Sequence, residues 1–94
     1  MELIFEWDAE KAESNVKRHK VSFHEAKTIF DDPFLMTFPD PEHSNGERRY
    51  VNVGRSTKGR VMVVVHTQRG ESTRIISCRK ATASERRFYE EGEN

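Results

Sequence analysis

Three strand-like segments separated by short turns constrain the fold of this chain more than any other feature of its sequence. Residues 49–54, 60–67 and 73–79 are rich in valine and isoleucine, and the middle segment is an almost continuous apolar run. The turns at residues 57–59 and 69–70 are short and contain glycine, which implies two successive hairpins. We therefore predict an antiparallel β-meander with the valine-rich strand in the middle.

Two helices are predicted before the meander. Asp8 is placed to cap the first helix, which should end near residues 19–20. Ser22 and Glu25 have the spacing of a capping box, in which the serine oxygen accepts from the amide of Glu25 and the glutamate carboxylate reaches back. Pro33 blocks continuation of the second helix. The expected buried face of that helix consists of Phe23, Ala26, Ile29 and Phe30.

Two further strands and a third helix complete the predicted elements. Residues 3–7 and 34–38 alternate in the manner of strands, and Thr82 and Glu85 form a second capping box that opens a C-terminal helix. The order strand, two helices, three or four antiparallel strands and a helix predicts an α+β fold with helices on one face of a sheet. Ninety-four residues have room for one such domain, spanning residues 1–94.

The net charge of zero hides an uneven distribution of charge along the chain. Residues 1–47 carry 11 acidic and 5 basic side chains, whereas residues 48–94 carry 11 basic and 5 acidic ones, and nine of those eleven cations are arginine. Arginine presents a planar, permanently charged fork that matches phosphate oxygens, so the clustering favours a nucleic-acid partner. The alternative is that the acidic half neutralises the basic half within one fold.

Several classes of site find no support in the sequence. Cys78 is the only cysteine, which excludes an internal disulfide and a cysteine-based zinc site. The four histidines lack partners at ligand spacing, so neither a metal nor another cofactor is expected. The N-terminus has no basic leader, and no apolar run has the length of a signal peptide or a membrane span. We therefore expect a cytoplasmic protein without a membrane partner.

His66, at the end of the central strand, is the candidate for proton transfer. Cleavage of RNA by attack of its own 2′-hydroxyl needs a proton acceptor, a proton donor and positive charge for the transition state, all of which side chains can supply without a metal ion. His66 could form such a set with Arg55, Arg74, Arg79 and Lys20. The alternative is an ordinary strand-end histidine with a satisfied hydrogen bond.

Arg74 and Arg79 are better candidates than the other arginines. Each lies in an otherwise apolar strand, where a charge destabilises the fold unless it has a partner or a ligand. Strict alternation places Arg74 on one face of that strand and Arg79 on the other. The arginines at strand ends or turns are expected to be ordinary surface charge: Arg48, Arg49, Arg60 and Arg69.

Two parts of the chain match the signatures of one known family. The first signature consists of residues 5–8, Lys11, Asn15, residues 17–26 and residues 30–33. The second consists of residues 74–81, continued by Glu85-Arg86 and Tyr89. Residues 53–56, Val-Gly-Arg-Ser, lie between them. In these residues the chain resembles the BrnT toxins, and the likeness covers nearly its whole length.

The resemblance implies a small bacterial ribonuclease toxin of a type II toxin–antitoxin system, RelE-like in fold, that cleaves RNA without a metal ion and inhibits translation. It also implies a partner, the antitoxin BrnA, whose ribbon-helix-helix part binds DNA, so that the toxin meets DNA only indirectly. On this interpretation Arg74, Arg79 and Arg55 bind the scissile phosphate and His66 handles a proton. Lys20 and Tyr89 are further candidates. The alternative function is a non-catalytic binding module in a repressor complex.

The chain departs from the family pattern mildly at Ser77-Cys78-Arg79, where Ser-Ala-Arg is typical, and more importantly at the end of the first predicted helix. Members usually have Lys-His-Gly before Val-Ser-Phe, whereas this chain has Arg18-His19-Lys20. Glycine suits the left-handed residue that ends a helix. Lys20 must therefore either adopt that conformation or shift the end of the helix.

Overall fold

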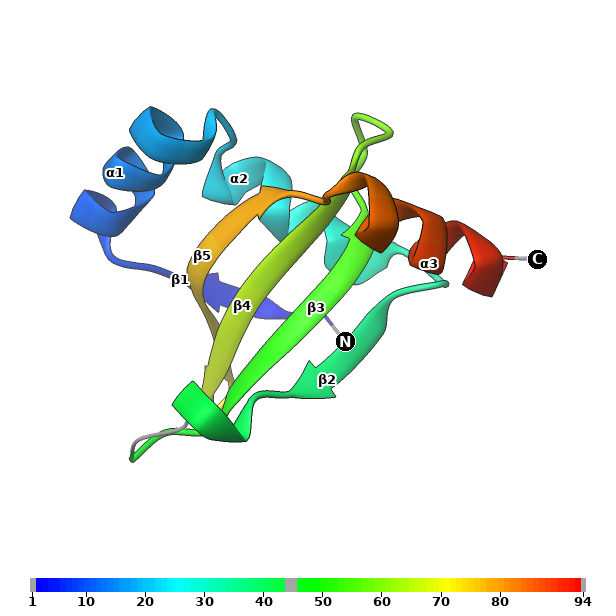
Figure 1. Cartoon of the computed structure of the whole chain (residues 1–94). Coiled ribbons are helices and arrows are strands. Elements are labelled where there is room, and N and C mark those ends of the chain that lie inside the picture. The colour runs from blue at the N-terminus through cyan, green and yellow to red at the C-terminus, as the bar shows by residue number, and fades with distance from the viewer. Residues whose placement is uncertain (1, 44–45, 94) are drawn as a thin grey trace.

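A five-stranded sheet in the order β1-β5-β4-β3-β2 forms the centre of the molecule (Figure 1). The structure, a computed structural model, describes residues 2–43 and 46–93. The strands are β1 (Ile4–Glu6), β2 (Met36–Pro39), β3 (Arg49–Arg55), β4 (Val61–Arg69) and β5 (Ser72–Lys80). The helical elements are α1 (Ala9–His19), α2 (Phe23–Ala26), the 3-10 helices η1 (Lys27–Asp31) and η2 (Pro41–His43), and α3 (Ala83–Glu93).

Strands β2 to β5 form an antiparallel meander, which confirms the predicted hairpins. The prediction of a wholly antiparallel sheet is wrong, because β1 pairs with β5 in parallel and makes the sheet mixed. Phe5 of β1 lies beside Thr73 of β5, far along the chain. A strand of three residues has no turn that fixes its direction, so only long-range packing sets this pairing.

Only one turn of the second predicted helix is α-helical. Ser22 Oγ accepts from the amide of Glu25 at 3.1 Å, as a capping box requires. The Glu25 carboxylate does not reach back to Ser22, however. It accepts from Ser56 Oγ at 2.7 Å and pairs with the guanidinium of Arg60. A charged partner brought by the fold thus replaces the local one, and the chain continues as the 3-10 helix η1.

Helices cover both faces of the sheet, so the expectation of helices on one face is wrong (Figure 1). On one face α2 and η1 pack over a core that includes Phe23, Ile29, Met62, Val64 and Ile75. On the opposite face Tyr89 of α3 packs against Val53, Val61 and Val63. The physical reason is that β4 is apolar on both of its faces, and each face must be shielded from water.

The part of this second face that α3 leaves uncovered is called the open face. We define it by four half-buried residues whose strand partners place them on the same side as Val63: Val51, Val65, Ser77 and Arg79. Figure 1 shows α3 crossing one end of the sheet, with β3, β4 and β5 continuing past it. The open face is therefore accessible to a ligand along three adjacent strands.

Helix α1 lies along the edge of β5, past the point where β1 ends. Asn15 Oδ1 accepts from the Cys78 amide at 3.1 Å, and Asn15 Nδ2 donates to the Cys78 carbonyl at 2.9 Å. Asn15 thus pairs with the backbone of β5 as a neighbouring strand would. The helix ends at His19 because Lys20 adopts the left-handed conformation, with φ 62°. Of the two alternatives for Lys20, the first is therefore correct.

None of the described helices is long and apolar enough to cross a membrane.

Candidate functional site

A β-bulge in β5 brings Arg74 and Arg79 to the same face of the sheet. The two arginines are five residues apart in β5, but their partners Val63 and Thr67 are four residues apart in β4. Ile76 is the extra residue, and an extra residue reverses the alternation of side chains. The prediction that the two arginines lie on opposite faces is therefore wrong. Both lie on the side of the sheet that carries the open face.

His66 lies on the opposite side of the sheet from Arg79 and is only 8% exposed. Its ring stacks on Tyr50 at 5.2 Å and meets the edge of Phe30 at 5.4 Å. Its Nδ1 lies 2.6 Å from Asn52 Nδ2, and because an amide nitrogen only donates, Nδ1 accepts. Burial lowers the pKa of His66. The structure does not bring this imidazole together with Arg79, and its role in proton transfer stays a prediction.

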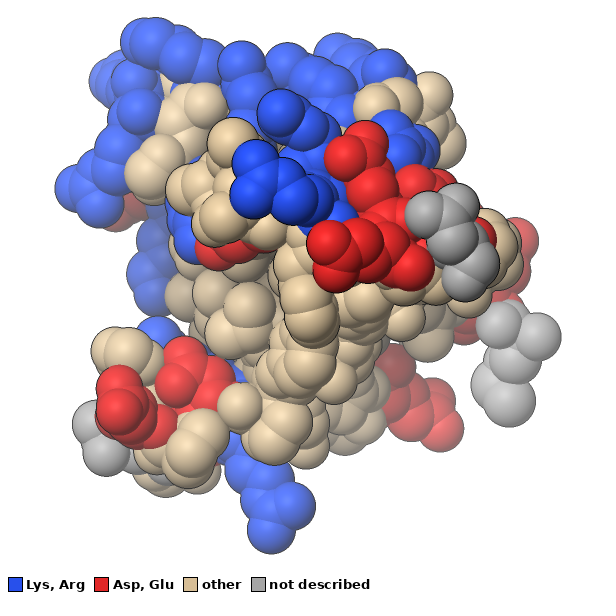
Figure 2. All heavy atoms as spheres, turned by 45° about the vertical axis from the view of Figure 1, so that its right-hand side comes forward, with Lys and Arg blue, Asp and Glu red and all other residues tan. Residues whose placement is uncertain are grey.

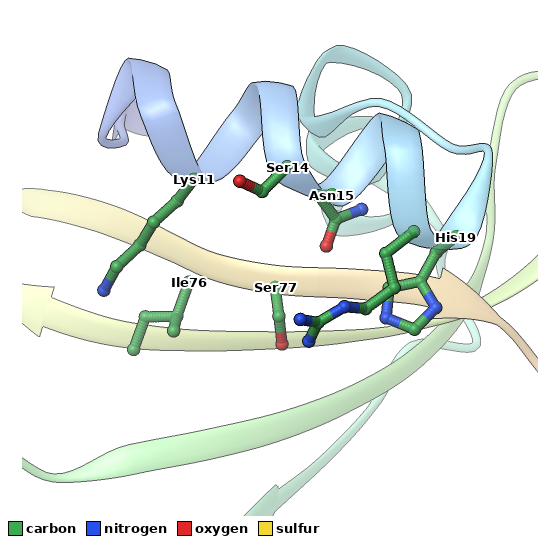
Figure 3. Close-up of a pocket in the computed structure, with 7 residues that line it drawn as sticks. Lys11, Ser14, Asn15, His19, Ile76 and Ser77 are labelled. Atoms are coloured by element: carbon green, nitrogen blue, oxygen red, sulfur yellow. The ribbon is translucent and has the colours of Figure 1, made fainter.

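Two adjoining hollows form a groove between the end of α1 and the open face. The first, of about 170 Å³, is shown in Figure 3 and is lined by Lys11, Ser14, Asn15, Arg18, His19, Ile76 and Ser77. The second, of about 280 Å³, is lined by His19, Val51, Val63, Val65, Ser77, Cys78 and Arg79. His19 and Ser77 line both hollows. We call the combined feature the α1–β5 groove.

The chemistry of the α1–β5 groove suits a nucleotide. Lys11, Arg18 and Arg79 contribute positive charge, while three valines of β3 and β4 form an apolar floor. In Figure 3 the side chains of Lys11, His19 and Ser77 extend to the same side of β5. Cations fix phosphate oxygens, and an apolar surface accepts the face of a base. An imidazole lies where the two kinds of surface meet.

The surface charge is unevenly distributed over the molecule. Figure 2 shows Lys and Arg side chains gathered along one side of the molecule, with a cluster of Asp and Glu beside them. Three arginines of the second half pair with glutamates of the first half, so the alternative of internal neutralisation holds for them: Arg60 with Glu25, Arg69 with Glu47 and Arg74 with Glu6. The expectation that Arg60 is ordinary surface charge is wrong, because Glu25 is buried.

Arg79 is held at the groove by a glutamate of α3. Its two terminal nitrogens donate to the two carboxylate oxygens of Glu85 at 2.7 and 2.9 Å. This pairing raises the pKa of Arg79, and it lowers the pKa of Glu85 to about 2. Glu85 also closes the capping box of α3 in both directions with Thr82, as the sequence predicted. The cap of α3 therefore fixes the direction in which Arg79 points.

Arg55 and Tyr89 lie together but outside the α1–β5 groove. The guanidinium carbon of Arg55 is 5.5 Å from the centre of the Tyr89 ring, and its Nη2 donates to Glu93 at 2.9 Å. Arg55 lines a separate hollow of about 290 Å³, which shares no lining residue with the groove: Arg55, Gly59, Arg60, Val61, Lys80, Ala81 and Arg86. Tyr89 is fully buried and donates its hydroxyl hydrogen to Asp32. The expected catalytic roles of both residues stay predictions.

Lys20 and Arg74 do not line the α1–β5 groove. Lys20 follows His19 directly, is exposed, and donates from Nζ to the Lys17 carbonyl at 3.0 Å. Arg74 Nη1 donates to Glu6 at 2.8 Å. Lys20 directly follows the end of α1, and Arg74 lies in β5. Their contact with a ligand stays a prediction.

Sequence reasoning missed four side chains of the groove: Lys11, Arg18, His19 and Ser77. One signal could have found them. Lys11 and residues 17–26 belong to the first family signature and residues 74–81 to the second, and these parts of the chain meet at this groove. Across residues 2–43 and 46–93, no three His, Cys, Asp or Glu side chains are grouped so that they could hold a metal ion.

The chain is similar to known proteins in sequence and in fold. The family model described as "Ribonuclease toxin, BrnT, of type II toxin-antitoxin system" matches residues 7–85. No curated protein matches the chain in sequence. The 1.1 Å crystal structure of the Brucella abortus ribonuclease toxin, BrnT, superposes with a TM-score of 0.68, covering 86% of this chain and 99% of that one at 19% identity. This likeness confirms the α+β fold, while the likeness to RelE stays a prediction.

Proposed function

We propose that this chain, which belongs to the BrnT family of ribonuclease toxins of type II toxin–antitoxin systems, cleaves RNA in the α1–β5 groove without a metal ion. Its family membership confirms the resemblance predicted from the two signatures. The observation that carries the choice of site is the groove itself, in which Arg18, Arg79 and an imidazole surround an apolar floor. The two signatures meet at that place.

The charge and the imidazole of the groove support this proposal, because cleavage without a metal ion needs proton transfer and positive charge. The 2′-hydroxyl of a ribose loses its proton and attacks the adjacent phosphorus, the bond to the 5′-oxygen breaks, and that oxygen takes up a proton. The products are a 2′,3′-cyclic phosphate and a 5′-hydroxyl. Negative charge grows on the phosphate oxygens in the transition state, and a fixed guanidinium stabilises it. We assign this role to Arg79, whose direction Glu85 fixes.

An RNA-cleavage assay in the presence of a chelator tests this function. We expect the wild-type chain to cleave, and Arg79→Gln to cleave at least tenfold more slowly. Arg69→Gln is the matched control, because Arg69 is also half-exposed and paired with a glutamate, at 2.8 Å. It should cleave as fast as wild type. Equal rates for both variants would reject the assignment of Arg79, and RNA binding without cleavage would favour the non-catalytic binding module.

We also propose that the toxin inhibits translation and that a BrnA-type antitoxin with a ribbon-helix-helix part neutralises it. Destruction of RNA explains the first effect, and the open, cationic groove offers the antitoxin a surface to cover. Expression of the chain alone should arrest growth, and co-expression of the product of an adjacent small reading frame should restore it. Arg79→Glu should weaken the complex, and unchanged affinity would locate the contact elsewhere. Contact with DNA would then occur only through the antitoxin.

A further inference from the structure

His19 occupies the junction of the two hollows that form the groove. It is the last residue of α1, and it lines both hollows together with Ser77 of β5. Figure 3 shows its ring reaching from the end of α1 to the side of β5 on which Ser77 lies. The imidazole of His19 therefore lines the groove whichever of the two hollows a bound group occupies.

Asn15, about one helical turn before His19, fixes the position of His19. Asn15 is buried and makes hydrogen bonds with the amide and carbonyl of Cys78 and with the carbonyl of Val21 at 3.1 Å. These bonds join α1 to β5 and to the segment that follows the helix. Because residues i and i+4 share a helix face, the bonds of Asn15 also hold His19 against β5. A reacting group held in this way needs little reorganisation.

The other three histidines make their contacts outside the groove. His66 is buried on the opposite side of the sheet with Asn52, and His24 meets Trp7 edge-on at 4.9 Å. His43 Nδ1 lies 3.0 Å from Asp40. Within residues 2–43 and 46–93, the His19 side chain makes no hydrogen bond, so both ring nitrogens are free for a ligand.

We propose that His19 is the catalytic base of the ribonuclease and takes the proton of the attacking 2′-hydroxyl. The proposal rests on the function proposed above. A ring nitrogen of neutral His19 accepts the 2′-proton while the 2′-oxygen forms its bond to phosphorus. The bond from phosphorus to the 5′-oxygen breaks, and that oxygen takes a proton from water in the open groove. Arg79 lines the same hollow and stabilises the phosphate charge.

Cleavage and binding, measured separately, test the role of His19. We expect His19→Asn to lower the cleavage rate about 100-fold or more, because general acid–base catalysis contributes roughly 10²–10⁴-fold. Its affinity for a 2′-O-methyl RNA, which cannot react, should stay within about twofold of wild type. Added imidazole should partly restore cleavage by His19→Ala.

His43→Asn is the matched control, because His43 lies on η2 outside the groove, and its cleavage rate should equal that of wild type. Cleavage by His19→Asn at the wild-type rate would overturn the role of His19 and leave the ribonuclease function standing. A loss of 2′-O-methyl RNA binding as large as the loss of rate would also overturn it, because His19 would then only bind. Failure of the wild-type chain to cleave RNA would reject the function and the base together.

Discussion

The hydrogen bond from Tyr89 to Asp32 offers a direct test of whether Tyr89 has a structural or a catalytic role. The ring of Tyr89 is fully buried against Val53, Val61 and Val63. Its hydroxyl hydrogen is donated to Asp32. Tyr89→Phe keeps the packing of the ring and removes only this bond. We expect the variant to be less stable and to cleave RNA at the wild-type rate.

The size of the loss follows from the remaining partners of Asp32. A hydrogen bond to a charged group contributes about 1.5–3 kcal/mol. Asp32 keeps two backbone donors, the amides of Arg55 at 2.7 Å and Phe34 at 2.9 Å, and water can reach its half-buried carboxylate. The cost therefore lies at the lower end, about 1.5 kcal/mol. With an m-value of about 1 kcal/mol/M for a domain of this size, the urea midpoint should fall by about 1.5 M.

The loss of stability in Tyr89→Phe should depend on pH in a defined direction. Burial raises the pKa of Asp32, but hydrogen bonds from Arg55, Tyr89 and Phe34 outweigh it, so the net pKa is lowered. A lowered carboxyl pKa stabilises the fold above the unfolded pKa, near 3.9, and this contribution is lost as the pH falls through the folded value. Burial and the bond to Asp32 raise the pKa of Tyr89 to about 12. The stabilising contribution of Tyr89 is fully present below the tyrosine pKa of the unfolded chain, near 10, and it is lost as the pH rises toward 12.

The difference in stability between wild type and Tyr89→Phe should therefore be largest near neutral pH and shrink below pH 4 and above pH 10. Urea unfolding at several pH values measures it. Tyr50→Phe is the control, because Tyr50 is the only other tyrosine and its hydroxyl makes no hydrogen bond within the described residues. Its midpoint should shift by less than about 0.5 M. A midpoint unchanged in Tyr89→Phe, or a loss of cleavage without a loss of stability, would refute the structural interpretation.

Two further substitutions give predictions of defined sign. Lys20→Gly should raise stability by about 0.5–1 kcal/mol, because relief of the left-handed strain, about 1–2 kcal/mol, exceeds the added entropy of the unfolded chain. Thermal unfolding checks this, and a lower midpoint would contradict it. Glu85→Gln keeps a side chain suited to the cap of α3 but removes the charge that pairs with Arg79, so RNA affinity at low salt should rise a few-fold. Filter binding across a salt series measures the change, and unchanged affinity would show that the Arg79–Glu85 pair does not compete with phosphate.

Local signals in the sequence predicted the elements of the fold well. Asp8 caps α1 by accepting from the amides of Glu10 and Lys11, as its position before the helix indicated. The short turns predicted the hairpins between β3, β4 and β5. Such features depend on residues close together in the chain. The same local reasoning failed for Glu25, because its carboxylate binds Ser56 and Arg60 about thirty residues away.

The candidate site was harder to predict because it depends on register and on packing between distant segments. One unpaired residue, Ile76, changes the face on which Arg74 lies, and no local pattern marks the bulge. His66 has the expected place at the end of a strand run, but its side chain belongs to the helix-covered core. His19 lies on a helix, and only its approach to Ser77 across the edge of β5 makes it a candidate.

The sequence by itself determined the α+β class, the antiparallel meander and the family, because caps, turns, apolar periodicity and signatures are short-range properties of the chain. The tertiary structure alone decided which arginine and which histidine share a groove. The physical reason is that a groove is made by contacts between α1 and β5, which Asn15 joins through the backbone of Cys78. The packing of the whole domain sets the strand register, the parallel pairing of β1 and the face on which each side chain is buried. No single segment of the chain encodes these features alone.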